Sequence, residues 1–86
     1  MQHRQALAQE IVSLEARVRE IEHTLARRDL ERMLAHAKGL ETKLDRELVN
    51  CRRLGRYTND YHKLETETQE QIRQTGKWLT MALLKF

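Results

Sequence analysis

The sequence predicts an all-α protein made of long amphipathic helices that form a coiled coil or a helical hairpin. Proline is absent, apolar residues recur at helical spacings of three and four, and no stretch alternates β-branched and polar residues. The hydrophobic fraction of 40% suits apolar stripes, while the aromatic fraction of 5% is too small for a thick core. A chain of 86 residues has room for one domain, residues 1–86, with a marginal core. We therefore expect a partner chain to complete the fold.

The first element is a heptad seam whose apolar residues are spaced by 4, 3, 4, 3 and 4 positions. A seam this narrow needs a partner helix, either from another chain or folded back from this one. Flanking charges neither demand nor forbid pairing with a second copy, so homo-oligomeric and hetero-complex partners both stay open. We expect this first seam to recruit a protein helix, and it consists of Leu7, Ile11, Leu14, Val18, Ile21 and Leu25.

The strict register stops after Leu25, because Arg28 and Arg32 occupy the next seam positions. We expect one continuous helix over about residues 3–54, since no helix breaker lies there. Asp29 as the N-cap of a separate helix is the alternative, and a bend near 27–29 or at Gly39 stays open. A second stripe follows within this helix at Met33, Ala37, Leu40, Leu44, Leu48 and Cys51.

The best candidate turn covers about residues 55–59. Gly55 follows two arginines, a pattern typical of a helix C-terminus, and Thr58, Asn59 or Asp60 can cap the next helix. A second helix over about 60–85 then folds back on the middle third of the chain. This gives a helical hairpin as the preferred topology.

The C-terminal segment is apolar around most of a helical circumference, which predicts burial on more than one side. We expect this end to dock into a groove within the protein's own complex. The segment also suits a peripheral membrane anchor, although only Arg73, Lys77 and Lys85 supply flanking charge. It is too short to span a bilayer. We take as the C-terminal anchor Trp78, Leu79, Met81, Leu83 and Phe86.

No catalytic, cofactor-binding or metal-ligating residue is predicted. The four histidines, His3, His23, His36 and His62, are scattered, whereas a zinc site needs three or four converging ligands. Nucleotide-binding glycine loops and hydrolase motifs are absent from the sequence. We interpret Cys51 as a small core residue rather than a reactive thiol. The protein is therefore not expected to be an enzyme.

Charge is mildly basic, with a net charge of +3 at pH 7. Two arginine clusters, residues 27–32 and 46–56, are the only candidates for phosphate contacts, and Tyr57 follows the second. Acidic residues interrupt both clusters, which favours a solvated face over nucleic-acid binding. The interrupting carboxylates belong to Asp29, Glu31, Asp45 and Glu47.

These features together predict a small coiled-coil scaffold or adaptor subunit of a larger complex. The alternative is a chaperone-like hairpin that shields an apolar client helix. The helix, the Gly55 turn, the polar helix with Tyr61 and Leu64, and the apolar end resemble the small co-chaperones of secretion-needle subunits. Nucleic-acid binding is a second alternative. The single cysteine and the polar start of the chain lead us to expect a soluble, intracellular protein, cytoplasmic with the nucleus left open.

Overall fold

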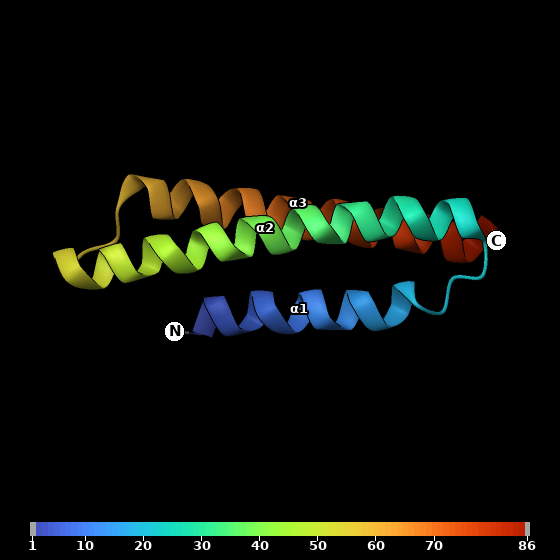
Figure 1. Cartoon of the computed structure of the whole chain (residues 1–86), viewed down its shortest axis with the longest axis horizontal. Helices are drawn as coiled ribbons and strands as arrows, with labels where there is room; N and C mark the ends of the chain where they lie inside the picture. Colours follow the sequence, from blue (N-terminus) through green and yellow to red (C-terminus); the bar gives the residue numbers. More distant parts are fainter. Residues whose placement is uncertain (1, 86) are drawn as a thin grey trace.

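The protein is a bundle of three α-helices, seen in a computed structural model (Figure 1). The helices are α1 (Gln2–Val18), α2 (Thr24–Leu54) and α3 (Asn59–Lys85). The structure describes the backbone of residues 2–85 and the side chains of residues 4–85, and this range contains no strand. The Cα atoms extend over 48 × 18 × 15 Å. The prediction of an all-α protein is confirmed.

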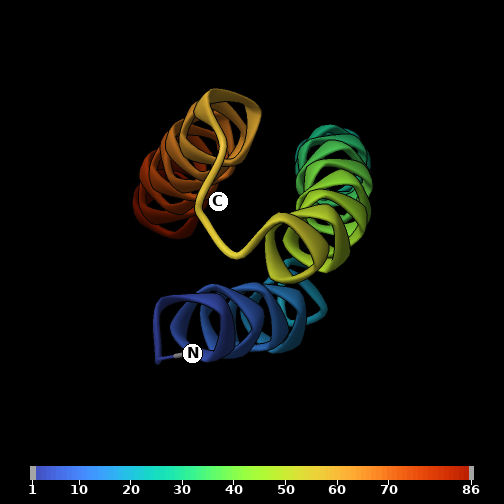
Figure 2. The same ribbon diagram turned by 90° about the vertical axis from the view of Figure 1, so that its left-hand side faces the viewer.

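The three helices run alternately up and down, and each packs on the other two (Figures 1 and 2). Viewed along the bundle, they lie at the corners of a triangle (Figure 2). Residues 55–58 join α2 to α3 at what we call the turn end. Residues 19–23 join α1 to α2 at the opposite, connector end, where α3 also finishes (Figure 1).

The core lies along the axis between the helices. It is apolar, apart from Thr68 and Thr75 of α3, whose hydroxyls donate to the carbonyls of Leu64 and Gln71 at 2.7 Å each. Both hydroxyls are thereby satisfied without water. The apolar core residues are Leu7, Ile11, Leu14, Val18, Ile21, Leu30, Leu34, Ala37, Leu44, Leu48, Cys51, Tyr61, Ile72, Leu79 and Ala82.

A break at residues 19–23 separates α1 from α2, so the expected continuous helix over residues 3–54 is wrong. The last turn of α1 tightens, since Glu20 N donates to Arg17 O at 3.1 Å and Ile21 N donates to Val18 O at 3.0 Å. Ile21 is buried within the connector. Burying it lets the seam of α1 pack against α2 of the same chain, and this gain outweighs the local preference for helix.

The second helix begins at residue 24 rather than near Asp29. His23 is its N-cap, and the Nδ1 atom of its ring accepts a hydrogen bond from the Ala26 backbone N–H at 3.2 Å. Asp29 and Gly39 both lie inside α2. The helix therefore continues through both positions at which the sequence allows a bend.

At the turn end, Gly55 caps α2 with a left-handed backbone (φ 73°), and its N–H donates to the Cys51 carbonyl. The next cap is Thr58, whose Oγ1 accepts from the Tyr61 backbone N–H at 3.1 Å. The same hydroxyl donates to Glu47 Oε1 at 2.7 Å, which ties the start of α3 to the last turns of α2.

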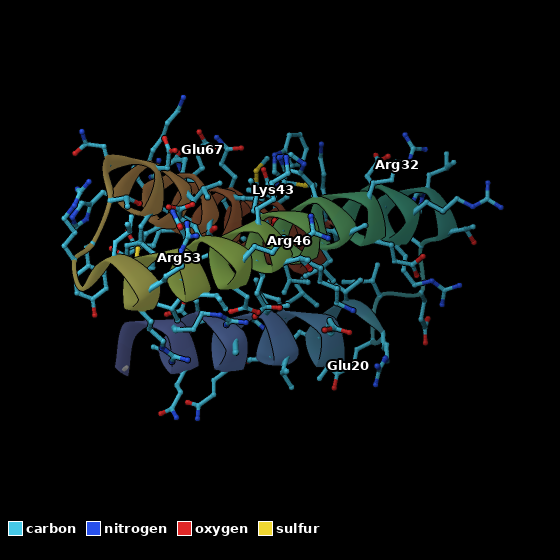
Figure 3. The ribbon with its side chains drawn as sticks, turned by 60° about the vertical axis from the view of Figure 1, so that its left-hand side comes forward. Glu20, Arg32, Lys43, Arg46, Arg53 and Glu67 are labelled. Atoms are coloured by element: carbon cyan, nitrogen blue, oxygen red, sulfur yellow. The ribbon has the colours of Figure 1, made fainter. Side chains whose placement is uncertain are left out.

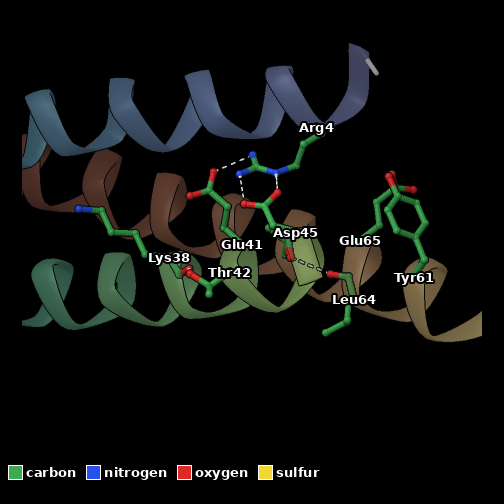
Figure 4. A network of polar contacts seen from close by, with 9 residues as sticks. Arg4, Lys38, Glu41, Thr42, Asp45, Tyr61, Leu64 and Glu65 are labelled. Carbon is green, nitrogen blue, oxygen red and sulfur yellow. Dashed lines mark hydrogen bonds and ion pairs between the residues drawn. The ribbon is translucent and has the colours of Figure 1, made fainter. Parts of the chain in front are cut away.

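Ion pairs set the position of α1 along α2. Arg4 of α1 contacts Glu41 at 2.8 Å, and its guanidinium donates two hydrogen bonds to the Asp45 carboxylate (Figure 4). Further along, Lys38 Nζ donates to Glu15 Oε2 at 2.9 Å. The hydrogen bond from Arg4 lowers the pKa of Asp45 below its usual value. These paired charges therefore stabilise the antiparallel packing of α1 on α2.

Candidate interaction surfaces

The first seam is buried inside the chain, except for its last member. Leu7, Ile11, Leu14, Val18 and Ile21 face α2 and α3. Leu25 fits the heptad spacing yet is 66% exposed, because the chain reverses direction at residues 19–23, just before it. The helices of the same chain thus cover the seam, so its five buried residues are not available to a partner helix.

The second stripe is likewise part of the interior. Ala37, Leu40, Leu44, Leu48 and Cys51 are buried, and Met33 is half-buried against the core. The Cys51 thiol is free, and its sulfur lies 3.7 Å from Thr58 Oγ1. This stripe is the face of α2 that α1 and α3 pack against.

The C-terminal anchor is divided between the interior and the surface, which corrects the expectation of burial on several sides. Leu79 is completely buried and the neighbouring Ala82 is largely buried, whereas Trp78 (56%) and Met81 (52%) are exposed. Leu83 is also exposed and lies by the connector, and Leu84, at 85%, is the most exposed large apolar residue among residues 4–85. Phe86 lies outside the described residues.

An apolar groove of about 250 Å³ lies between the first turns of α2 and the last turns of α3. Its exposed apolar walls are Leu25 of α2 and Trp78 and Met81 of α3. Asp29 lines the α2 side and Lys85 lines the α3 side, so opposite charges border the two edges. The groove therefore presents three large apolar side chains to solvent between two polar rims.

The groove brings together residues of two sets that the sequence keeps apart. Leu25 belongs to the first seam, and Trp78 and Met81 belong to the C-terminal anchor. One signal in the sequence pointed to the different role of Leu25: the two arginines at the next heptad positions show that the seam has already stopped there. The pairing of Leu25 with Trp78 depends on how α2 and α3 lie side by side.

Within residues 2–85, no helix is long and apolar enough to cross a bilayer. The same part of the chain holds no cluster of three or more His, Cys, Asp or Glu side chains placed to bind a metal ion.

No protein-family model, curated protein or solved structure matches the chain. The function is therefore argued from the surfaces of the molecule itself.

Proposed function

We propose that the protein is a non-enzymatic interaction module, a small helical scaffold or adaptor subunit that binds an amphipathic helix of a partner protein in its apolar groove. The observation that carries this proposal is the exposure of Leu25, Trp78 and Met81 around one concave surface. Large apolar residues that gather on a surface and are rimmed by polar groups are typical of protein-binding sites.

The shape of the groove favours a helix as the occupant. Two neighbouring helices form its sides, and an added helix packs on such a pair with its i, i+3 and i+4 side chains between them. Trp78 stands at the mouth, and tryptophan is the residue type that most often dominates binding energy at protein interfaces. Asp29 and Lys85 on opposite edges favour a helix that carries complementary charges beside its apolar face.

Site-specific photo-crosslinking tests this proposal. A photoreactive amino acid at position 81, inside the groove, should give one discrete adduct in cells that make the protein. The same amino acid at position 54 is the control, because Leu54 is exposed on α2 at the turn end, away from the groove. Equal labelling at the two positions, or no adduct at position 81, would contradict the proposal. An adduct of two copies of the chain would identify the partner as a second copy.

Affinity then measures the contribution of the groove. Each large apolar side chain removed from water contributes roughly 1.5–3 kcal/mol, so Leu25→Ala should weaken binding of the purified partner about tenfold or more. Leu54→Ala removes the same atoms from an exposed leucine outside the groove. It should leave the dissociation constant unchanged.

A further inference from the structure

The outward face of α2 carries a row of cations that the proposed function does not use. The arginines of the two sequence clusters lie on this single helix, except for Arg56 in the turn, and Lys43 lies between the clusters. Figure 3 shows four of these side chains spread along α2. Its cations are Arg28, Arg32, Lys43, Arg46 and Arg53, His36 lies among them, and all six side chains are exposed.

The spacing of these residues places them on one side of the helix. At about 100° per residue, the six positions fall within an arc of about 100°, centred opposite the buried stripe. From Arg28 to Arg53 the row covers about 38 Å at 1.5 Å per residue. We call this surface the basic face.

Two of the carboxylates that alternate with the cations in the sequence are directed elsewhere in the structure. Glu41 and Asp45 contact Arg4 of α1, and Glu47 accepts hydrogen bonds from Thr58 and Asn50. The contacts with Arg4 thus turn Glu41 and Asp45 away from the basic face. Glu47 stays beside the face, because its partner Asn50 lies on the face and also accepts a hydrogen bond from Arg53. The fold therefore separates two of the interleaved carboxylates from the cations.

Two carboxylates border the basic face at its N-terminal end, and each forms an ion pair with a nearby arginine of α2. Asp29 lies 4.0 Å from Arg32, and Glu31 lies 3.5 Å from Arg27. By helical position, Glu47 is the one other carboxylate beside the face within α2, and its Oε1 atom accepts hydrogen bonds from Thr58 and Asn50. Glu67, which Figure 3 labels, belongs to α3.

Three cations of the face have no ion pair or hydrogen bond among residues 4–85: Arg28, Lys43 and Arg46. Like charges held in one row repel each other, so this arrangement does not stabilise the fold. The middle of the face is formed by small residues, Ala35, Gly39 and Thr42. An added Cβ at Gly39 would meet nothing within 4 Å, so a ligand can approach the helix backbone closely there.

We propose that the basic face binds the phosphate backbone of double-stranded nucleic acid. Arginine and lysine contacts to phosphate dominate such binding and need no specific base contacts. The straight row of about 38 Å matches one helical turn of a duplex, about 34–36 Å. Phosphates along both edges of one groove of the duplex then lie within reach of the basic face.

Two other polyanions fit this face less well. Helices that bind a membrane surface carry a continuous apolar face beside their cations. In α2 the apolar stripe is buried in the core, and the exposed apolar residues near the basic face, Leu25, Val49 and Leu54, are too far apart to form such a face. Single-stranded nucleic acid is held by several aromatic side chains on which successive bases stack, and the basic face carries no Trp, Tyr or Phe among the described residues. The face therefore offers mainly a line of charge.

Gel-shift titrations with DNA and RNA duplexes of about 25 base pairs, over a range of salt concentrations, test the proposal. Five phosphate contacts predict that the logarithm of the association constant falls with the logarithm of salt with a slope of about −4 to −5. The double variant Arg28→Gln/Arg46→Gln should bring the slope about 2 units closer to zero and weaken binding at least about tenfold. Binding of either duplex supports the proposal.

The matched control is Arg17→Gln/Lys63→Gln, which removes the same net charge from exposed positions on α1 and α3. It should keep both the slope and the affinity close to those of the parent protein. An equal loss in the two double variants would show that only net charge matters, and would overturn the proposal. Binding to vesicles of anionic phospholipid without binding to either duplex would overturn it as well. The groove residues stay unchanged in all variants, so the result is independent of the proposed helix binding.

Discussion

The two ends of the bundle differ in how completely the chain covers them. At the turn end, Gly55 and Thr58 close α2 and begin α3, and the rings of Tyr57 and Tyr61 pack with their centroids 4.9 Å apart. At the connector end, Leu25 and Trp78 stand in solvent beside an apolar groove. The turn end leaves Leu54 and Tyr57 half exposed. The connector end gathers three exposed large apolar side chains, Leu25, Trp78 and Met81, around one groove. The difference teaches that what distinguishes the connector end is the clustering of its exposed apolar residues.

The largest expected effect on the free energy of unfolding separates a buried from an exposed leucine at the connector end. Leu79 is 0% exposed and Leu84 is 85% exposed, although both lie within the last turns of α3. Leu79→Ala leaves a cavity and should lower the free energy of unfolding by about 3 kcal/mol, whereas Leu84→Ala should change it by less than about 0.5 kcal/mol. Urea denaturation followed by circular dichroism measures both. Similar losses in the two variants would mean that the last turns of α3 are not divided in this way.

A smaller effect should come from Gly55 at the turn end, and Gly39 in the middle of α2 provides the opposite expectation. Gly55→Ala places a side chain at φ 73° and should destabilise the protein by about 1–2 kcal/mol, although the added Cβ meets no atom within 4 Å. Gly39→Ala, inside α2 and equally free of contacts, should stabilise it by up to about 1 kcal/mol. The same denaturation curves decide the sign. A stabilising Gly55→Ala would contradict the left-handed cap.

Tyr61 should have the smallest effect on the free energy of unfolding at neutral pH. In alkali it should give that free energy its steepest dependence on pH. Its hydroxyl donates to Glu65 Oε2 at 3.2 Å, and burial together with the Glu65 charge raises the pKa of Tyr61 to about 12, from an ordinary value of 10.0. The folded state therefore keeps a proton that the unfolded state releases. Stability from this group is complete below pH 10 and is lost as the pH rises towards 12.

Tyr61→Phe is the matched variant, because it keeps the buried ring and removes the titrating group. Its free energy of unfolding should change by less than about 1 kcal/mol at pH 7. Between pH 10 and pH 12 its stability should fall less steeply than that of the parent protein. Parallel pH profiles for the two proteins would show that burial at the turn end does not shift this group.

Periodicity in the sequence identifies most of the interior but not the number of helices. The residues at seam and stripe positions on either side of the connector, such as Leu14 and Leu44, are buried as their spacing of three and four requires. The break between them is invisible, because Arg19, Glu20 and Glu22 carry no turn signal and tertiary packing overrides their local preference. The cap at His23 is equally hidden, since histidine is not a usual N-cap residue.

The candidate surfaces are likewise only partly predictable from the sequence. Trp78 and Met81 are noticed from their apolar character, but the sequence places them in the interior rather than on the surface. Their neighbour Leu25 is far away in the chain, so only the packing of α2 on α3 brings the groove together. The basic face follows from helical geometry alone once α2 is known to be continuous. The basic face is not evident when charges are counted along the sequence, because it forms only when they are placed around the helix.

Trp78 has a further consequence, because it is the single tryptophan of the chain and stands half exposed at the groove. The intrinsic fluorescence of the protein, excited selectively at its indole, comes from this one site. A helix seated in the groove removes water from the ring and moves the emission towards the blue. A duplex on the basic face should shift the emission less, because Trp78 belongs to α3 and not to that face. One unlabelled chromophore thereby distinguishes occupancy of the two surfaces in the same cuvette.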